Sequence, residues 1–469
     1  SAIETTFDLL NPDCQKVFLR LATFAGGWNH FGAVSLCPDV DVDAALRDLE
    51  EVCLIASNEF GPIMRFTMLD TVRAFALERT SAPERAAWLR EHAVYHYQRA
   101  LEFNQHDNLA RFEGLVDESA NLRQAVEWFM DNDLEEESLK FCALIGRYGV
   151  FVDRPLDVVD MLESALERFD DSNQFPAVRA EAMVRLASVY NRLGNDTRAR
   201  EIIEKAEAIL KGIDAPKVWI ELHLALAEVD HANHDFDAEC GSLRQALELS
   251  LKASSFRADR IYLSMGHVMV ERQDRARAAE LYQQSIDESK AKNDGYRVAL
   301  ATSSLANLHR LEHNFTLAEE LAQTSLDTLS AFPGRFFTAD AQLLLAQIYL
   351  DENKLDECRA MLLKVIESDP QTEWQREELC LVLARVCSKS EDFELSARYL
   401  GFNRVLDQLE ARPCIATNDL RSVVRRVESE LGSKSFRQHY DVGSFWTWKT
   451  VRESAIRLCD SPASVVNSV

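Results

Sequence analysis

The sequence predicts an all-α chain with one small exception near its start, and three observations lead to this prediction. Its 469 residues include only 16 Gly and 11 Pro, so few positions break a helix. Long segments repeat their apolar residues about every 3.6 positions, and almost none alternate. Beyond residue 140, a pair made of one apolar and one small residue recurs every 38 to 41 residues. We therefore expect a small first domain followed by an array of stacked helical hairpins.

Residues 1–80 are the exception. "NPDCQKVFLRLATF" is an amphipathic helix with Asn11 or Asp13 as its cap and Pro12 in its first turn. Two short helices follow in "HFGAVSLC" and "DVDAALRDLEEVCLI", the latter capped by Asp41 or Asp43. "LIASNEFGPIMRFTM" predicts two strands around a turn at residues 59–62, and "DTVRAFALER" predicts a helix capped by Asp70. Three helices, a β-hairpin and another helix form a winged-helix pattern.

Charge argues against nucleic acid as a partner of this segment. The chain has 52 basic and 77 acidic residues, a formal net charge of −25. The expected third helix of the winged-helix unit carries Asp43, Asp48, Glu50 and Glu51 against Arg47 alone. A helix that reads the major groove needs the opposite charge, so we expect a packing role for this unit and no DNA binding.

The repeated pair of residues predicts where two helices approach closely. Its small members are Gly146, Ala187, Ala227, Gly266, Ala306, Ala346 and Ala384. Twelve residues further on, a second small residue follows in five units: Ala199, Ala278, Ala318, Cys358 and Ser396. Sixteen residues after the first small site, bulky residues follow at Leu162, Ile203, Leu243, Tyr282, Leu362 and Leu400. The unit "MVRLASVYNRLGNDTRAREIIEKAEAIL" resembles a tetratricopeptide repeat (TPR), with a period near 40 in place of that family's 34.

The residue after each small site is polar in all seven units, which predicts a polar stripe on the inner face of the array. With further polar residues three positions on, the candidate ligand-binding residues of this groove are Ser188, Asn191, Glu228, His231, His267, Asn307, Arg310, Gln347 and Arg385. The alternative is an ordinary solvated helix face. Reversing the charge of Arg310 and Arg385 is expected to spare folding and to abolish ligand binding.

Catalytic motifs are not found in the sequence. There is no G-x-x-x-x-G-K-[ST] phosphate loop, no G-x-S-x-G and no H-E-x-x-H. His92 and His96 are four residues apart on a helix but lack an acidic partner for a metal, and an enzyme built on His231 or His267 would lack a nucleophile. We therefore expect no enzyme activity, no cofactor and no metal site in this chain.

The cysteines are scattered and form no CxxC pair, which predicts reduced thiols and a cytoplasmic protein. The sequence contains no apolar run of 18 residues, so no membrane span is predicted. Because the chain begins at Ser1 and not at Met, we expect it to be a segment excised from a longer protein. The expected domains are a winged-helix unit at 1–80, a helical connector at 81–133, and a TPR-like array at 134–410. Capping helices at 411–460 and a disordered tail at 461–469 complete the chain.

An ordered set of segments resembles the C-terminal region of bacterial STAND-type predicted ATPases, which are signal-transduction NTPases and transcriptional regulators. The segments are "VFLRLATFAGGW", "RFTMLDTVRAFALER", "EHAVYHYQRALE", "DESANLRQAVEWFM", "SARYLGFNRVLDQLEARP" and "ESELGSKSFRQHYDVGSFWTWKTVRESA". The resemblance implies an upstream nucleotide-binding module that this chain lacks. It also implies that Met68, Leu69 and Asp70 contact that module, although Leu69 replaces the histidine of the family's Met-His-Asp triplet.

Together these features predict the sensor region of a signal-transduction regulator. The array would bind a protein, peptide or small inducer in its groove, and binding would change how it docks on the NTPase module. The alternative is a constitutive scaffold or peptide-binding adaptor without switching.

Overall fold

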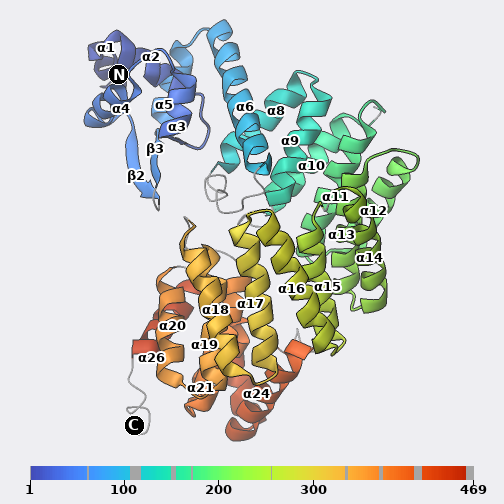
Figure 1. Ribbon diagram of the computed structural model, residues 1–469. Helices are drawn as coiled ribbons and strands as arrows, with labels where there is room; N and C mark the ends of the chain where they lie inside the picture. The colour runs from blue at the N-terminus through green and yellow to red at the C-terminus, as the bar shows by residue number, and fades with distance from the viewer. Residues whose placement is uncertain are drawn as a thin grey trace. The chain divides into compact units, whose positions relative to one another are not determined.

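The computed structural model describes residues 2–60, 63–105, 118–148, 155–170, 173–254, 256–332, 336–368, 373–405 and 415–460 (Figure 1). The chain divides into two compact units, Ser1–Ala253 and Ser254–Val469. The division falls inside the helical array that the sequence predicts as continuous. The expected tail at 461–469 lies outside the described residues.

The first unit begins with short helices and a small sheet. These elements are α1 (Ala2–Leu9), α2 (Pro12–Leu21), β1 (Trp28–Asn29), α3 (His30–Leu36), α4 (Val42–Glu51), β2 (Ala56–Phe60), β3 (Ile63–Thr67) and α5 (Asp70–Arg79). The three strands form an antiparallel sheet in the order β1-β3-β2. The elements predicted for residues 1–80 are therefore present in their predicted order, and α1 and β1 are additions that the sequence pattern did not indicate.

Local capping explains where these helices begin. The Asn11 side chain accepts from the Cys14 N–H at the start of α2, and Asp41 accepts from Ala44 N–H at the start of α4, as predicted. The predicted cap of α5 is wrong. Leu69 occupies the N-cap position with extended backbone angles, and Asp70 is already the first helical residue. Its carboxylate still lies at the positive end of the helix dipole, where it is favourable.

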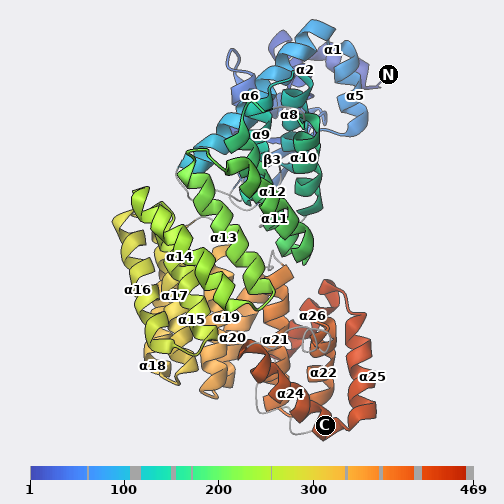
Figure 2. The ribbon, with the colours of Figure 1, turned by 90° about the vertical axis from the view of Figure 1, so that its right-hand side faces the viewer.

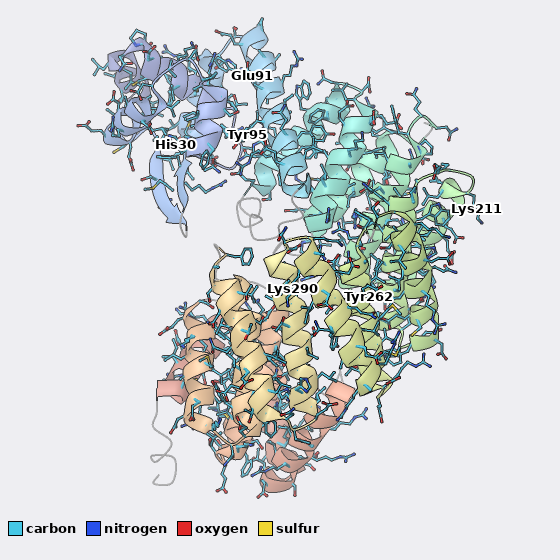
Figure 3. All side chains as sticks on the ribbon, viewed as in Figure 1. His30, Glu91, Tyr95, Lys211, Tyr262 and Lys290 are labelled. Carbon is cyan, nitrogen blue, oxygen red and sulfur yellow. The ribbon has the colours of Figure 1, made fainter. Side chains whose placement is uncertain are left out.

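Two long helices connect this part to the array. They are α6 (Ala82–Gln105) and α8 (Ser119–Asp131). Tyr95 on α6 faces α3, since its hydroxyl lies 3.6 Å from the position a Cβ would take on Gly32 (Figure 3).

Helices then pair along the chain. The pairs are α9 (Glu135–Tyr148) with α10 (Pro155–Arg168), α11 (Pro176–Arg192) with α12 (Asp196–Leu210), and α13 (Pro216–Ala232) with α14 (Phe236–Lys252) in the first unit. In the second unit, α15 (Ala258–Glu271) pairs with α16 (Arg275–Ala291), α17 (Gly295–Leu311) with α18 (Phe315–Ser330), α19 (Phe336–Asp351) with α20 (Leu355–Glu367), and α21 (Glu373–Lys389) with α22 (Phe393–Phe402). Each pair is an antiparallel hairpin (Figures 1 and 2).

The predicted small sites lie where the paired helices meet. The five alanines of the set are at most 3% exposed. A Cβ added to Gly266 would lie 2.4 Å from the Tyr282 ring, so only glycine lets α15 approach α16 there. Ser396, a predicted second small residue, donates to Ala384 O at 2.8 Å. The small residues that recur in the sequence are therefore the positions at which the paired helices pack closely.

Three further helices close the second unit: α24 (Ile415–Leu431), α25 (Ser433–Ser444) and α26 (Trp448–Asp460). Phe436, Tyr440 and Val451 from these helices share one buried cluster with Leu362 and Leu400 of the array. The apolar end of the last hairpin is thereby covered, which is the role expected of a capping segment.

Candidate functional site

Three predicted binding residues lie close together in the second unit, on α17 and α21, which are the first helices of two hairpins. Arg310 of α17 donates from Nη1 to Asp351 Oδ2 of α19 at 2.5 Å, and Arg385 of α21 donates from Nη2 to Asp351 Oδ1 at 2.5 Å. Arg310 also donates from Nε to Asn307 Oδ1 at 3.0 Å. One carboxylate therefore ties three helices together.

This arrangement differs from an exposed basic stripe. Arg310 is only 9% exposed, and both guanidiniums already have an anionic partner in Asp351. A glutamate at either position would face Asp351, so charge reversal would not spare folding as the sequence suggested.

Two further carboxyls lie beside this cluster on the same helices. Gln347 donates from its side-chain amide to Glu378, and Gln375 donates to Asp340 Oδ1 at 2.8 Å. Burial raises the pKa of Asp340 to about 6. Burial also raises the pKa of Glu378, and the nearby charges of Arg310 and the Gln347 hydrogen bond oppose that shift.

His267 is the exposed member of the predicted set in the second unit. Its Nε2 lies 3.1 Å from the Ser304 hydroxyl on α17, and its ring packs edge-on against Tyr282 at 5.5 Å between centroids. The side chain is thus oriented by the two neighbouring helices α16 and α17.

In the first unit the predicted residues lie on α11 and α13. His231 is half exposed, and its Nδ1 lies 3.0 Å from Glu239 Oε2 on α14. Ser188 and Glu228 are partly buried. Asn191 is also partly buried, and its Oδ1 is a buried acceptor without a hydrogen-bond partner among the described residues.

The sequence did not reveal the anionic partners on these helices. They include Asp340, Asp351 and Glu378 in the second unit and Glu221 in the first, where Glu221 pairs with Arg185 at 3.1 Å between α11 and α13. A signal was present, because Arg185 and Glu221 are 36 residues apart and Arg385 and Asp351 are 34 apart. Opposite charges about one repeat apart lie on neighbouring first helices.

Of the residues predicted to contact a nucleotide module, Met68 and Leu69 lie between β3 and α5, and Asp70 is the first residue of α5. Leu69 is 72% exposed and Asp70 is exposed, whereas Met68 packs partly against the core of the first domain. Two of the three side chains are therefore available to another molecule.

A buried polar cluster joins the first domain to α8. Asn121 is fully buried, its Oδ1 accepts from Ala25 N–H at 2.8 Å, and its Nδ2 donates to Gly27 O at 2.8 Å. Arg65 of β3 donates to Glu118 at 2.9 Å and to Gly26 O at 2.6 Å. The loop between α2 and β1 is therefore fastened to the helix that leads into the array.

His92 and His96 lie in this buried region and not at a surface site. Their ring centroids are 4.4 Å apart, both rings pack edge-on against Phe24, and burial lowers the pKa of His92 to about 4. Across the described residues, no group of three or more His, Cys, Asp or Glu could hold a metal ion.

A family model for the tetratricopeptide repeat matches residues 180–209 and 339–372. These ranges fall on the α11–α12 and α19–α20 hairpins, one in each unit. The chain therefore carries tetratricopeptide repeats. No described helix combines the length and the apolar content that crossing a membrane requires.

Curated relatives match part of the chain. Proteins named "Putative HTH-type transcriptional regulator" from Mycobacterium bovis and Mycobacterium tuberculosis are 28% identical over 224 residues, 45% of this chain. The chain spans about a quarter of the length of these relatives, since the match covers 25% of each.

Solved structures with similar helix arrangements have low identity. A STAND protein with a tetratricopeptide repeat sensor, PH0952 from Pyrococcus horikoshii, has a TM-score of 0.44 at 15% identity and covers 97% of this chain and 67% of its own. The apo form of RapI has a TM-score of 0.48 at 11% identity, covering 78% of this chain and 98% of its own. These likenesses are loose, and the repeat assignment depends on the family model and the hairpins themselves.

Proposed function

We propose that this chain is the sensor and protein-interaction region of a bacterial, cytoplasmic STAND-type signal-transduction regulator. In this proposal the repeats bind a protein, peptide or small inducer, and binding controls an NTPase and effector module outside this chain. The observation that carries the proposal is the set of polar side chains on successive first helices of a tetratricopeptide array. Such arrays commonly use this surface for partners.

The chemistry of that surface suits a peptide. Asn191 is partly exposed on α11, and His267 is exposed on α15. Amide and imidazole groups can bond to peptide backbone groups, while the fixed arginine–aspartate cluster would bind polar side chains. Because the first helices alternate with helices on the other face, a bound extended chain would contact several repeats of one unit.

The first domain supports the proposed link to an NTPase module. Its order α2-β1-α3-α4-β2-β3, with α5 following, fits a winged-helix domain. Leu69, Phe31 and Leu9 of this domain are large apolar side chains that are 72%, 66% and 83% exposed. We propose that the nucleotide-binding module covers part of this surface, and that DNA does not, because α4 is acidic.

We further propose that this chain has no catalytic activity of its own, because its sequence carries no phosphate-binding loop. Any NTP hydrolysis would then belong to the complete protein.

A peptide-binding screen tests the proposal. The chain would be probed against an array of synthetic peptides, and hits would be measured by fluorescence polarisation with Asn191→Ala and His267→Ala variants. Gln283→Ala is the matched control, because Gln283 is exposed on the second helix α16 and bonds only Asp287 of its own helix among the described residues. A peptide bound in the first unit should be lost in Asn191→Ala, a peptide bound in the second unit should be lost in His267→Ala, and either should be retained by the control.

Retention of full affinity in both variants would place the ligand elsewhere and contradict the proposed surface. For a peptide that binds, NTP hydrolysis by the complete protein separates the two classes of function. A changed rate supports the switch, and an unchanged rate with intact binding supports the alternative of a constitutive scaffold.

A further inference from the structure

A second candidate site lies away from the repeat surface, at the junction of the first domain and the array. An open cavity of about 490 Å³ is bounded by α5, the loop before β1, α8 and the first turn of α10. Its lining residues are Ala25, Arg73, Ser119, Ala120, Arg123, Gln124, Glu127 and Asp157. This volume is in the range of small-molecule sites, and the lining is rich in polar groups.

Arg73 lines this cavity with hydrogen-bond donors that a ligand could use. Its Nε donates to Ala22 O at 2.9 Å, and its two Nη groups have no partner in the part of the chain that the structure describes. The side chain is partly buried, and burial lowers its pKa. The Nη groups of this half-buried side chain keep contact with solvent in the open cavity, and a guanidinium bonds more strongly to an anion than to a neutral acceptor.

The charge of Asp70, also on α5, acts on Arg73 and partly opposes the effect of burial, but no lining residue makes an ion pair with Arg73 in the described part of the chain. Arg123 Nη2 lies 3.3 Å from Asp157 Oδ1, so these two charges offset each other. Glu127 is exposed at the rim of the lining, where water screens its charge. Gln124 donates its side-chain amide to Thr23 O at 2.8 Å.

We propose that this cavity binds an oxyanion, the phosphate or carboxylate group of a small molecule. Arg73 donates its two Nη groups to the oxyanion, and Arg123 and the Ser119 hydroxyl complete the site from α8. A guanidinium fork matches both phosphate and carboxylate in a two-pronged geometry. Because Arg73 belongs to α5 and Arg123 to α8, a bound ligand bridges the first domain and the array, and so stabilises their junction.

The test uses the full chain and two simple probes. Inorganic phosphate is titrated by ³¹P NMR and ¹³C-labelled acetate by ¹³C NMR, each at constant ionic strength. We expect saturable binding of at least one probe, and the comparison of the two identifies which oxyanion the site prefers.

Variants then locate the binding. Arg73→Lys keeps the charge and loses the fork, and Arg123→Gln removes one donor. Each is expected to weaken binding roughly tenfold to a hundredfold, the usual effect of losing one charge-assisted hydrogen bond. Arg437→Gln is the control, because Arg437 lies on α25 in the other unit with a side chain 62% exposed, and it should leave the titration unchanged.

Two outcomes would overturn the site. One is the absence of saturable binding for both probes, and the other is unchanged affinity in Arg123→Gln with a native circular dichroism spectrum. Arg123→Gln keeps the test decisive if Arg73→Lys fails to fold. The result does not depend on the proposed peptide surface, since the Asn191→Ala variant should bind the oxyanion normally.

Discussion

Replacing Asn121 by Ala should release the loop that fastens the first domain to α8. The side chain is fully buried, accepts from Ala25 N–H at 2.8 Å and donates to Gly27 O at 2.8 Å. Gly26 N–H makes a longer bond of 3.3 Å to the same oxygen. Each buried group left unbonded costs about 1–3 kcal/mol, so the loss of the two short bonds together predicts a destabilisation of roughly 2–6 kcal/mol.

Hydrogen exchange measured by mass spectrometry is the suitable assay, because a chain of two units need not unfold in one step. Peptides covering residues 22–29 should exchange at least about tenfold faster in Asn121→Ala, a factor that corresponds to about 1.4 kcal/mol. Asn132→Ala is the matched control. Asn132 is exposed at the other end of α8 and donates only to Trp128 O of the same helix among the described residues, so its loss should leave this loop unchanged.

Asn121→Asp tests the donor role of this side chain separately from its acceptor role. The aspartate keeps the acceptor for Ala25 N–H but cannot donate to Gly27 O, and it places a second carboxylate beside Glu118, to which Asn121 now donates. We expect this nearly isosteric variant to destabilise the loop as much as Asn121→Ala. If the loop exchanges at the wild-type rate in both variants, then Arg65 and its neighbours hold the junction without Asn121, and our reasoning about it is wrong.

Three further predictions concern the array. Ala187→Leu should overpack the α11–α12 hairpin and destabilise the chain by about 1–3 kcal/mol in urea unfolding. The control Ala291→Leu changes an exposed alanine and should not destabilise the chain. Equal unfolding midpoints for the two variants would contradict the repeat register. Asp351→Asn leaves the guanidinium of Arg310, only 9% exposed, without its anion, and should cost about 2–3 kcal/mol, less than for a fully buried pair; an unchanged melting temperature would show that solvent already satisfies that arginine. Asp340→Asn should stabilise the second unit at pH 7, because the folded-state pKa of Asp340 is raised to about 6 and ionisation of this carboxyl above that pH opposes folding. The gain in stability should disappear as the pH falls through 6 toward 4. A gain in melting temperature that does not depend on pH would refute this origin.

The hairpins could be predicted from the sequence because their packing depends on single residues at a fixed spacing. A small residue at Ala187 or Gly266 is needed for close helix approach, and this requirement recurs with every repeat. Caps such as Asn11 are equally local, since the side chain bonds a backbone group three residues away. Features that depend on neighbours within a few turns, or on a strict period, can thus be read without a structure.

Features formed by distant residues could not be predicted in the same way. The strand β1 is only two residues long and exists because Trp28 and Asn29 pair with Phe66 and Arg65, which lie much further along the chain. The bonds of Asn121 to the loop before β1 span more than 90 residues. No local pattern marks such contacts, because each partner alone is an ordinary polar or aromatic residue.

The predicted binding residues illustrate the same limit, and they also suggest how a ligand could act. Polarity placed Arg310 and Arg385 in one candidate set, but the sequence did not show that both side chains bond Asp351. An anionic ligand group that bound either arginine would compete with Asp351 and weaken a tie between neighbouring first helices. A ligand that bound only Asn191 or His267 would leave those ties intact. A ligand of the first kind would differ in affinity between hairpin arrangements with and without that tie, and a differential affinity is what a switch requires.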